Sequence, residues 1–333
     1  MKIYRHILII IILFFSPYLH SQLGTTTSTI STDNHNNGNF ANGSSGGSGL
    51  GNWTIATANG GDAGSYTGGS AIGNSFALWS NSSTIYASRL FDENLKKGDV
   101  FSIDLGHTAT INSEIGIQLI NVSGNAIITL KFMSGASEWK LNNGGSDFSS
   151  GQNYAANTAL TFTFTYDDNN SADRYSYTFG SGSGDNHTAT NDISTIRGFK
   201  IYSNYQGAGQ NFGFNNVSVT SKYTIDGNQT VSCNDSQDIP YLTIKSGSTL
   251  NIAKNGKVKV RGDFSNSGTT TLNSDADEFA SLIVQGTSSG NITYKRWVAD
   301  EGSNEWDLIG SPVAGQTISS FVSANSSLAD EGN

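Results

Sequence analysis

The sequence has little cysteine and few charged residues, and each shortage excludes some classes of protein. Cys233 is the only cysteine in 333 residues, so the chain can form no internal disulfide. No histidine or basic residue stands beside Cys233 to lower its thiol pKa, so we expect it to be buried as a small apolar side chain. Stability must therefore come from packed cores, which a chain of this length can build.

Charged residues make up 14% of the chain, against about 25% in typical globular proteins. Asn, Ser, Thr and Gly must therefore provide most of the polar surface. The net charge of −9 argues against nucleic acid or an anionic membrane as a partner, because both are bound through basic patches.

The longest apolar run lies at the very start of the chain. Lys2 and Arg5 precede the apolar stretch 7–15, and Ser21 supplies a small residue before Gln22. This order is typical of a secretory signal peptide, and the run is shorter than the ~20 residues that span a bilayer. We expect residues 1–21 to be removed by signal-peptide cleavage, after passage through export machinery, and the mature chain to be secreted or held at the cell surface without a membrane span.

Residues 22–49 contain mostly Thr, Ser, Asn and Gly. A stretch with so little apolar surface cannot offset the entropy of ordering it, so we predict a flexible leader. At most, one edge strand is expected around Phe40.

Apolar and polar residues alternate from about residue 50 to residue 221, and no window carries a helical apolar stripe. Alternation with period two indicates strands that bury one face each. Short strands of this kind separated by polar turns predict an antiparallel jelly-roll β-sandwich of about ten strands over residues 50–221. The clearest apolar series are 101-103-105, 115-117-119, 128-130-132, 160-162-164-166 and 175-177-179.

The spacing changes over residues 222–298, where apolar pairs repeat every eight residues. The repeat is typical of stacked rungs of a short β-solenoid or β-roll, although a meander of tight hairpins has the same spacing. We favour the solenoid because Thr, Ser and Asn are common in its turns. The pairs are Leu242 with Ile244, Leu250 with Ile252, and Val258 with Val260.

Residues 299–333 are irregular, and no capping element follows the repeats. Because an open solenoid end normally needs a cap, we expect the chain to be the front part of a longer one.

Three groups of segments carry a resemblance to known families: 98–104, 196–202 and 212–219 in the sandwich; 242–260 in the repeats; and 290–297 with 306–313. On the first group, the sandwich resembles jelly-roll and lectin-like modules that accompany polysaccharide-degrading enzymes and bacterial surface proteins. The repeats resemble the β-roll that follows such modules, and the last group is similar to an element of large proteins exported by the type IX secretion system. This resemblance implies an exported architecture rather than a reaction.

Catalytic motifs are missing from the sequence. Glycoside hydrolysis needs two facing carboxyl groups, and the nearest cluster, Asp275, Asp277 and Glu278, falls in a polar turn. There is neither a Gly-x-Ser-x-Gly elbow nor a His-Glu-x-x-His motif. We therefore expect no enzyme activity and no cofactor, although a hydrolase with carboxylates from distant strands stays open.

A metal site is not expected either. The loop Asp167–Asp173 has oxygen side chains at alternate positions, which suits Ca²⁺, but lacks the central Gly and terminal Glu of a strong calcium motif. Asp and Asn are also the ordinary residues of a hairpin turn.

Glycan binding is the best positive hypothesis. Aromatic rings stack on the apolar faces of sugars while amides bind the hydroxyls. The candidates are Trp79, Trp139, Tyr202 and Tyr205, and the alternative for each ring is a place in the core. We predict a non-catalytic binding or adhesion module for an extracellular polysaccharide, with a purely structural stalk as the second possibility.

Overall fold

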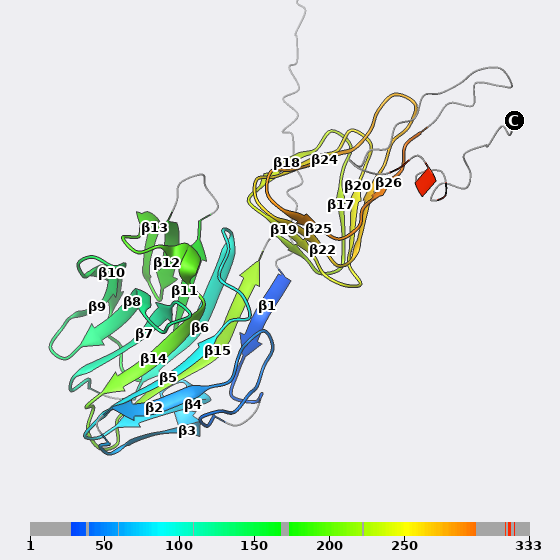
Figure 1. Cartoon of the computed structure of the whole chain (residues 1–333). Helices are drawn as coiled ribbons and strands as arrows, with labels where there is room; N and C mark the ends of the chain where they lie inside the picture. The colour runs from blue at the N-terminus through cyan, green and yellow to red at the C-terminus, as the bar shows by residue number, and fades with distance from the viewer. Residues whose placement is uncertain are drawn as a thin grey trace, which may run out of the picture.

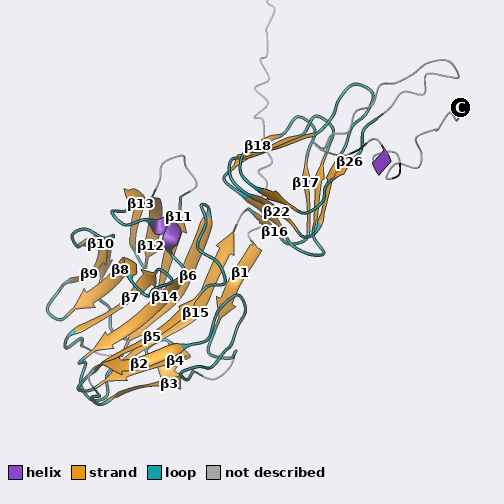
Figure 2. Ribbon diagram, in the orientation of Figure 1, coloured by secondary structure: helices purple, strands orange, loops and turns teal. Residues whose placement is uncertain are grey.

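The chain folds into a two-layered β-sandwich followed by a three-sided parallel β-solenoid (Figures 1 and 2). The computed structural model describes residues 28–297 except 38–39, 59, 109, 168–172 and 222, together with a few positions between 317 and 323. The predicted all-β class is confirmed. The sandwich has fifteen strands rather than about ten, in sheets of eight and seven. Within the described part, no helix has the length and apolar character that crossing a membrane requires.

The eight-stranded sheet runs in the order β13-β12-β11-β6-β15-β4-β3, with β1 paired to β15. Adjacent strands are antiparallel, and most of them come from distant parts of the chain, as in a jelly roll. The strands are β1 (Ser28–Asp33), β3 (Ala63–Ser70), β4 (Gly73–Ser80), β6 (Asp99–His107), β11 (Leu160–Tyr166), β12 (Arg174–Phe179), β13 (Gly182–Thr188) and β15 (Asn211–Ser221).

The seven-stranded sheet runs in the order β10-β9-β8-β7-β14-β5-β2 and is also antiparallel. A single 3₁₀ turn, η1 (Ile193–Thr195), leads toward β14. The strands are β2 (Thr54–Ala58), β5 (Thr84–Leu90), β7 (Glu114–Ile120), β8 (Ala126–Met133), β9 (Glu138–Asn142), β10 (Phe148–Asn153) and β14 (Gly198–Asn204).

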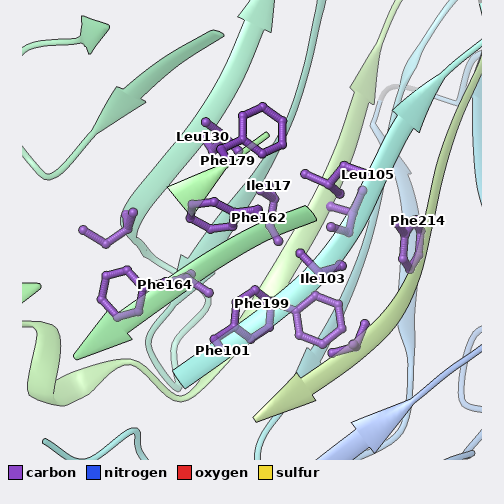
Figure 3. Close-up of a cluster of buried hydrophobic side chains, with 14 of the residues drawn as sticks. Phe101, Ile103, Leu105, Ile117, Leu130, Phe162, Phe164, Phe179, Phe199 and Phe214 are labelled. Carbon is purple, nitrogen blue, oxygen red and sulfur yellow. The ribbon is translucent and has the colours of Figure 1, made fainter. Parts of the chain in front are cut away.

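The core lies between the two sheets and is built from the alternating residues (Figure 3). Phe162 pairs with Ile103 and Phe164 with Phe101 across β11 and β6. Phe199 of the facing sheet lies 5.8 Å from Phe101, measured between ring centroids. All five side chains are almost completely buried. Each strand therefore leaves its other row of side chains on the outer surface of the sandwich.

The predicted flexible leader is wrong where the structure describes it. Ser28–Asp33 forms β1, which pairs with β15 as an edge strand. Phe40 is 7% exposed, and its ring centroid lies 4.9 Å from that of Trp53 and 5.0 Å from that of Phe76. Composition missed this order because backbone pairing and one buried ion pair hold the segment, rather than an apolar stripe.

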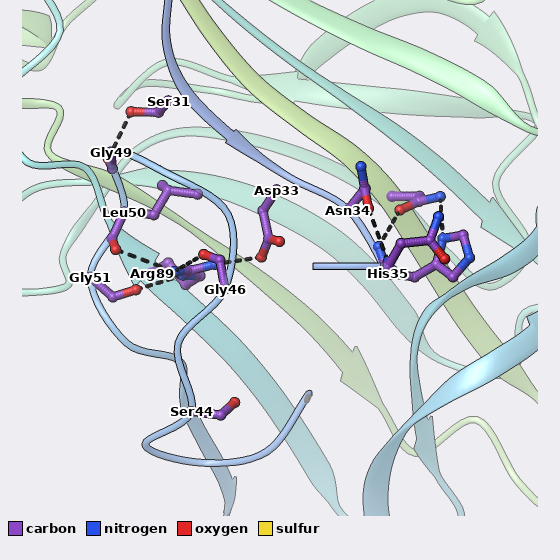
Figure 4. A network of polar contacts seen from close by, with 12 residues as sticks. Ser31, Asp33, Asn34, His35, Ser44, Gly46, Gly49, Leu50, Gly51 and Arg89 are labelled. Atoms are coloured by element: carbon purple, nitrogen blue, oxygen red, sulfur yellow. Dashed lines mark hydrogen bonds and ion pairs between the residues drawn. The ribbon is translucent and has the colours of Figure 1, made fainter. Parts of the chain in front are cut away.

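That ion pair joins Arg89 on β5 to Asp33 at the end of β1 (Figure 4). The guanidinium also donates to the carbonyl oxygens of Gly51 at 2.6 Å, Gly46 at 2.8 Å and Leu50 at 3.2 Å. Its side chain is fully buried. The Arg89 guanidinium is thus surrounded by oxygens of residues that precede β2. These contacts fix that segment to the sandwich.

The solenoid stacks three rungs and part of a fourth, with parallel pairing on each of its three sides. This confirms the predicted solenoid, because a hairpin meander would pair antiparallel. The eight-residue repeat, however, marks the three sides of one rung and not successive rungs: Leu242, Leu250 and Val258 lie in three different sheets and pair with Phe264, Thr270 and Leu282 of the next rung. The strands are β16 (Thr224–Ile225), β17 (Asn228–Val231), β18 (Ser236–Ile239), β19 (Leu242–Ile244), β20 (Thr249–Ile252), β21 (Lys257–Val260), β22 (Phe264–Asn266), β23 (Thr269–Leu272), β24 (Ser281–Val284), β25 (Ser288–Ser289) and β26 (Thr293–Tyr294).

The solenoid interior is a core of its own, filled by the apolar pairs. Leu242, Ile244, Leu250 and Ile252 are all 0% exposed. Cys233 is not part of it. The thiol is exposed, contrary to prediction, because Cys233 lies in the turn between β17 and β18 instead of in a strand.

Polar contacts join the first rungs of the solenoid to the sandwich. The hydroxyl of Tyr241 donates to the Asp99 carboxylate at 2.5 Å and lies 2.7 Å from the Ser221 hydroxyl. The other Asp99 oxygen accepts from the Lys96 backbone N–H at 2.8 Å. All three hydrogen-bonded side chains are at most 8% exposed. Burial raises the pKa of Asp99 despite these donors.

Replacing Arg89 with Met should lower the free energy of unfolding by about 3–5 kcal/mol, because it leaves the buried Asp33 carboxylate and three carbonyl oxygens without their cation. Urea unfolding followed by circular dichroism measures the change. Lys254→Met is the matched control, since it removes a cation from an exposed ion pair with Asp275, and it should lower the free energy of unfolding far less, because exposed ion pairs contribute little. Equal losses in both variants would contradict the structural role of Arg89.

Asp99→Asn should flatten the dependence of stability on pH. A carboxyl group with a raised pKa stabilises the fold fully below its unfolded pKa of about 3.9, and this contribution is lost as the pH rises through the folded value. The free energy of unfolding of the Asn variant, minus that of the native chain, should therefore be larger at neutral pH than in acid. Unfolding free energies across this range test it, and a difference that is constant with pH would refute the expectation.

Candidate functional site

The structure separates the four aromatic residues that were predicted to bind sugar. Trp139 on β9 is 2% exposed and packs against Phe132 and Phe179 in the core, so the prediction is wrong for this residue. Its inward position follows from the strand alternation, which turns Glu138 and Lys140 outward. Trp139 therefore has no open face for a ligand.

The other three rings lie in three different places. Trp79 is partly buried in the eight-stranded sheet, and its ring lies directly over Gly64. A Cβ atom at position 64 would lie only 2.7 Å from that ring. Tyr205 is 48% exposed in the loop after β14. Tyr202 lies on β14 and lines a pocket of the seven-stranded sheet. Of the four, only Tyr202 lines that pocket.

The pocket is open and has a volume of about 270 Å³. Its walls come from the outward rows of three adjacent strands, in which Tyr202 of β14 pairs with Tyr86 of β5 and with Gly116 of β7. The lining residues therefore occupy alternate positions on these strands, and the residues between them are buried. The lining residues are Thr84, Tyr86, Glu114, Gln118, Lys200, Tyr202 and Asn204.

The Tyr202 ring crosses the floor of the pocket. A Cβ on Gly116 would meet its hydroxyl oxygen at 2.6 Å, so only glycine leaves room for the ring at this position. The hydroxyl donates to Glu114 Oε1 at 2.7 Å. Burial and the neighbouring Glu114 carboxylate raise the pKa of Tyr202, so it stays protonated as a donor. Since Tyr202 is only 8% exposed, the partly exposed ring of Tyr86 is the more accessible one.

Two amide side chains of the pocket have oxygens with no donor. Gln118 Oε1 and Asn204 Oδ1 are buried, and neither has a hydrogen-bond partner in the described part of the chain. A buried acceptor without a donor costs roughly 1–3 kcal/mol. Both residues line the same pocket, but the two oxygens themselves are shielded from solvent, so a ligand would reach them only after the side chains rotate.

Lys200 provides the positive charge of the pocket. Its ammonium donates to the Gly124 carbonyl oxygen at 3.2 Å, and partial burial lowers its pKa. Within the described residues no carboxylate forms an ion pair with it. By contrast, the two other lysines on this face are paired, Lys131 with Asp147 at 2.8 Å and Lys140 with Glu138 at 2.5 Å.

A second cavity, of about 240 Å³, lies between the sandwich and the solenoid. Four of its five charged residues have partners: Lys96 forms an ion pair with Glu93 at 2.7 Å, Asp99 is bonded to Tyr241, and Lys245 is paired with Asp226 at 2.8 Å. The Lys96 ammonium also lies 5.1 Å from the centroid of the Tyr241 ring. Most of the charges in this cavity are therefore used in contacts within the protein, and we take the sheet pocket as the candidate site.

The acidic residues considered for catalysis or metal binding do not form a site. Asp275 Oδ1 accepts from the backbone N–H groups of Asp277 and Glu278, at 3.2 Å and 2.9 Å, which makes the cluster a turn. In the described residues, no group of three acidic, His or Cys side chains is placed to hold a metal ion. The Asp167–Asp173 loop falls largely outside the described residues.

Among the lining residues, the sequence predicted Tyr202 but did not mark Tyr86, Glu114, Gln118 or Lys200. The alternation around Phe199 and Ile201 does place Lys200 and Tyr202 on the outward face of one strand. What it lacks is the strand order, because β5, β7 and β14 are far apart in sequence and become neighbours only in the sheet.

No protein-family model matches the chain, and no curated protein matches its sequence significantly. Solved structures with similar arrangements include a sialidase, with a TM-score of 0.40 and 11% identity over 51% of this chain and 17% of that one. Galectin LEC-6 of Caenorhabditis elegans matches with a TM-score of 0.29 and 14% identity, over 38% of this chain and 86% of the galectin. The cellulose-induced protein Cip1 matches with a TM-score of 0.36 and 12% identity, over 50% and 90%. This chain thus spans about a sixth of the sialidase, and similarity at this level transfers no function.

Proposed function

We propose that this chain is an exported, non-catalytic glycan-binding module whose ligand lies across the outward face of β5, β14 and β7. The observation that carries the proposal is an open pocket in which the partly exposed Tyr86 ring lies beside the hydrogen-bonding side chains of Gln118, Lys200 and Asn204. Sugar hydroxyls form hydrogen bonds with such side chains, and an aromatic ring offers an apolar surface to the sugar C–H groups.

Binding without hydrolysis fits the carboxylates of the pocket. Glu114 is the one acidic residue among its lining residues, and it accepts the Tyr202 hydroxyl. Hydrolysis by the usual route needs a second carboxyl group, about 5–5.5 Å away for retention or about 6.5–9.5 Å away for inversion. The nearby Asp147 is engaged by Lys131 and by the Asn142 amide, at 2.8 Å and 2.9 Å.

The solenoid fits the role of a spacer for this module. The contacts of Tyr241 with Asp99 and Ser221 are buried and fix its first rungs to the sandwich. A spacer role for the solenoid is compatible with glycan binding by the sandwich. The pocket lies on β5, β7 and β14, and the solenoid contacts do not involve these strands.

Tyr86→Ala should weaken glycan binding at least about tenfold, as expected when one aromatic anchor of a small site is removed. The double variant Gln118→Ala/Asn204→Ala should weaken it to a similar degree. Pull-down on insoluble polysaccharides identifies a ligand, and titration of its soluble oligosaccharide gives the dissociation constants.

Tyr205→Ala is the matched control, because it removes an equally large ring that is exposed outside the pocket. It should bind like the native chain, and circular dichroism should show all variants folded. Retained binding by Tyr86→Ala, or an equal loss in Tyr205→Ala, would place the ligand elsewhere. Release of reducing sugar by the native chain would contradict the non-catalytic part of the proposal.

A further inference from the structure

We propose that the glycan bound in the sheet pocket is acidic, and that Lys200 binds its anionic group, a uronate carboxylate or a sulfate ester. This inference rests on the proposed function and names its ligand class. It comes from a difference between three lysines on one face of the seven-stranded sheet, two of which form ion pairs within the described residues while the third does not.

Lys131 and Lys140 are neutralised by the protein itself. Lys131 is paired with Asp147 at 2.8 Å, and Lys140 with Glu138 at 2.5 Å. Lys200, which lines the pocket, donates instead to the uncharged Gly124 carbonyl oxygen at 3.2 Å. A partly buried cation without a counterion is electrostatically unfavourable, because burial removes water that would otherwise solvate it. An anionic ligand would supply the missing counterion.

The pocket is also polarised along its strands. Lys200 lies opposite Gln118 on β7, whereas Asn204 lies opposite Glu114. Four residues of strand separate the two ends, which corresponds to about 13 Å. The Glu114 carboxylate would repel an anion at one end, while Lys200 attracts it at the other. The ligand's acidic group is therefore expected beside Lys200 and Gln118, and its uncharged hydroxyls beside Asn204.

The net charge of −9 sharpens this assignment. A protein of this charge repels acidic polymers in general, so it has no diffuse affinity for them. Discrimination between acidic and neutral glycans must then depend on local contacts, and Lys200 is the pocket residue that can provide them. The advantage conferred by Lys200 should shrink as salt screens the charges.

The test compares the native chain with Lys200→Gln on matched probes. Polygalacturonate and alginate carry carboxylates, dextran sulfate carries sulfates, and dextran, from which dextran sulfate is made, is neutral. The native chain should prefer an acidic probe, and Lys200→Gln should lose at least about tenfold in affinity for that probe alone, as for one charge-assisted hydrogen bond. Preference for the polyuronates would identify the carboxylate, and preference for dextran sulfate the sulfate.

Lys140→Gln is the control, since it removes a paired lysine from the same face and should leave the affinity within about twofold of native. Equal losses for acidic and neutral probes in Lys200→Gln, or equal native affinity for both, would overturn the acidic assignment. Binding to neutral glycans that depends on Tyr86 but not on Lys200 would do so while leaving the proposed function intact. Failure of the native chain to bind any glycan would overturn both.

Discussion

Burial of one face of every sandwich strand against the opposite sheet is the interaction on which the rest of this structure depends. The chain has no disulfide to hold its layers together, and few charges to pair. Phe101, Phe162 and Phe199 illustrate how rows from both sheets fill the space between them. Because alternate side chains of each strand form this core, the side chains between them face outward. These outward side chains do not pack between the sheets and can serve another purpose.

Arg89 is the main departure from that pattern. It occupies an inward position of β5 between Ala87 and the start of the next loop, yet it is charged and fully buried. The oxygens around it come from Asp33 and from backbone carbonyls between residues 46 and 51. Loops in which oxygens converge in this way commonly hold a metal cation. Here the chain supplies its own cation, which helps to order a mostly polar segment whose apolar contacts with the core come from Ile30, Phe40 and Leu50.

The sequence allowed the class of fold and the change of repeat to be predicted, because both depend on local periodicity. Leu242, Leu250 and Val258 repeat every eight residues, and each begins the apolar pair of one solenoid strand. The order of β1 was not predictable in the same way. Asp33 and Arg89 are 56 residues apart, and nothing in either neighbourhood marks them as partners.

The candidate site shows the same limit from the opposite direction. Periodicity indicates that Lys200 and Tyr202 face away from the core, as do Tyr86 and Gln118 on their own strands. It also predicts that Trp139 faces inward with Leu141, two residues further along the same strand, although chemistry alone made this ring an attractive platform. Aromatic character therefore misled where alternation, applied strictly, would have excluded the residue. Only the sheet order brings the outward residues together.

The pocket is assembled from positions that the fold does not constrain, and this explains its two unusual features. A position released from the core can keep an amide oxygen without a donor, as at Gln118 and Asn204, or a lysine without a counterion, as at Lys200. Each of these costs stability, and elsewhere on the same face the chain removes the cost by pairing Lys131 and Lys140. Unpartnered amide oxygens alone do not distinguish the pocket, because Trp139 Nε1 and Thr270 Oγ1 are buried without partners elsewhere in the described residues. The distinguishing feature is Lys200, which within the described part of the chain has no ion pair, on a face where Lys131 and Lys140 each have one.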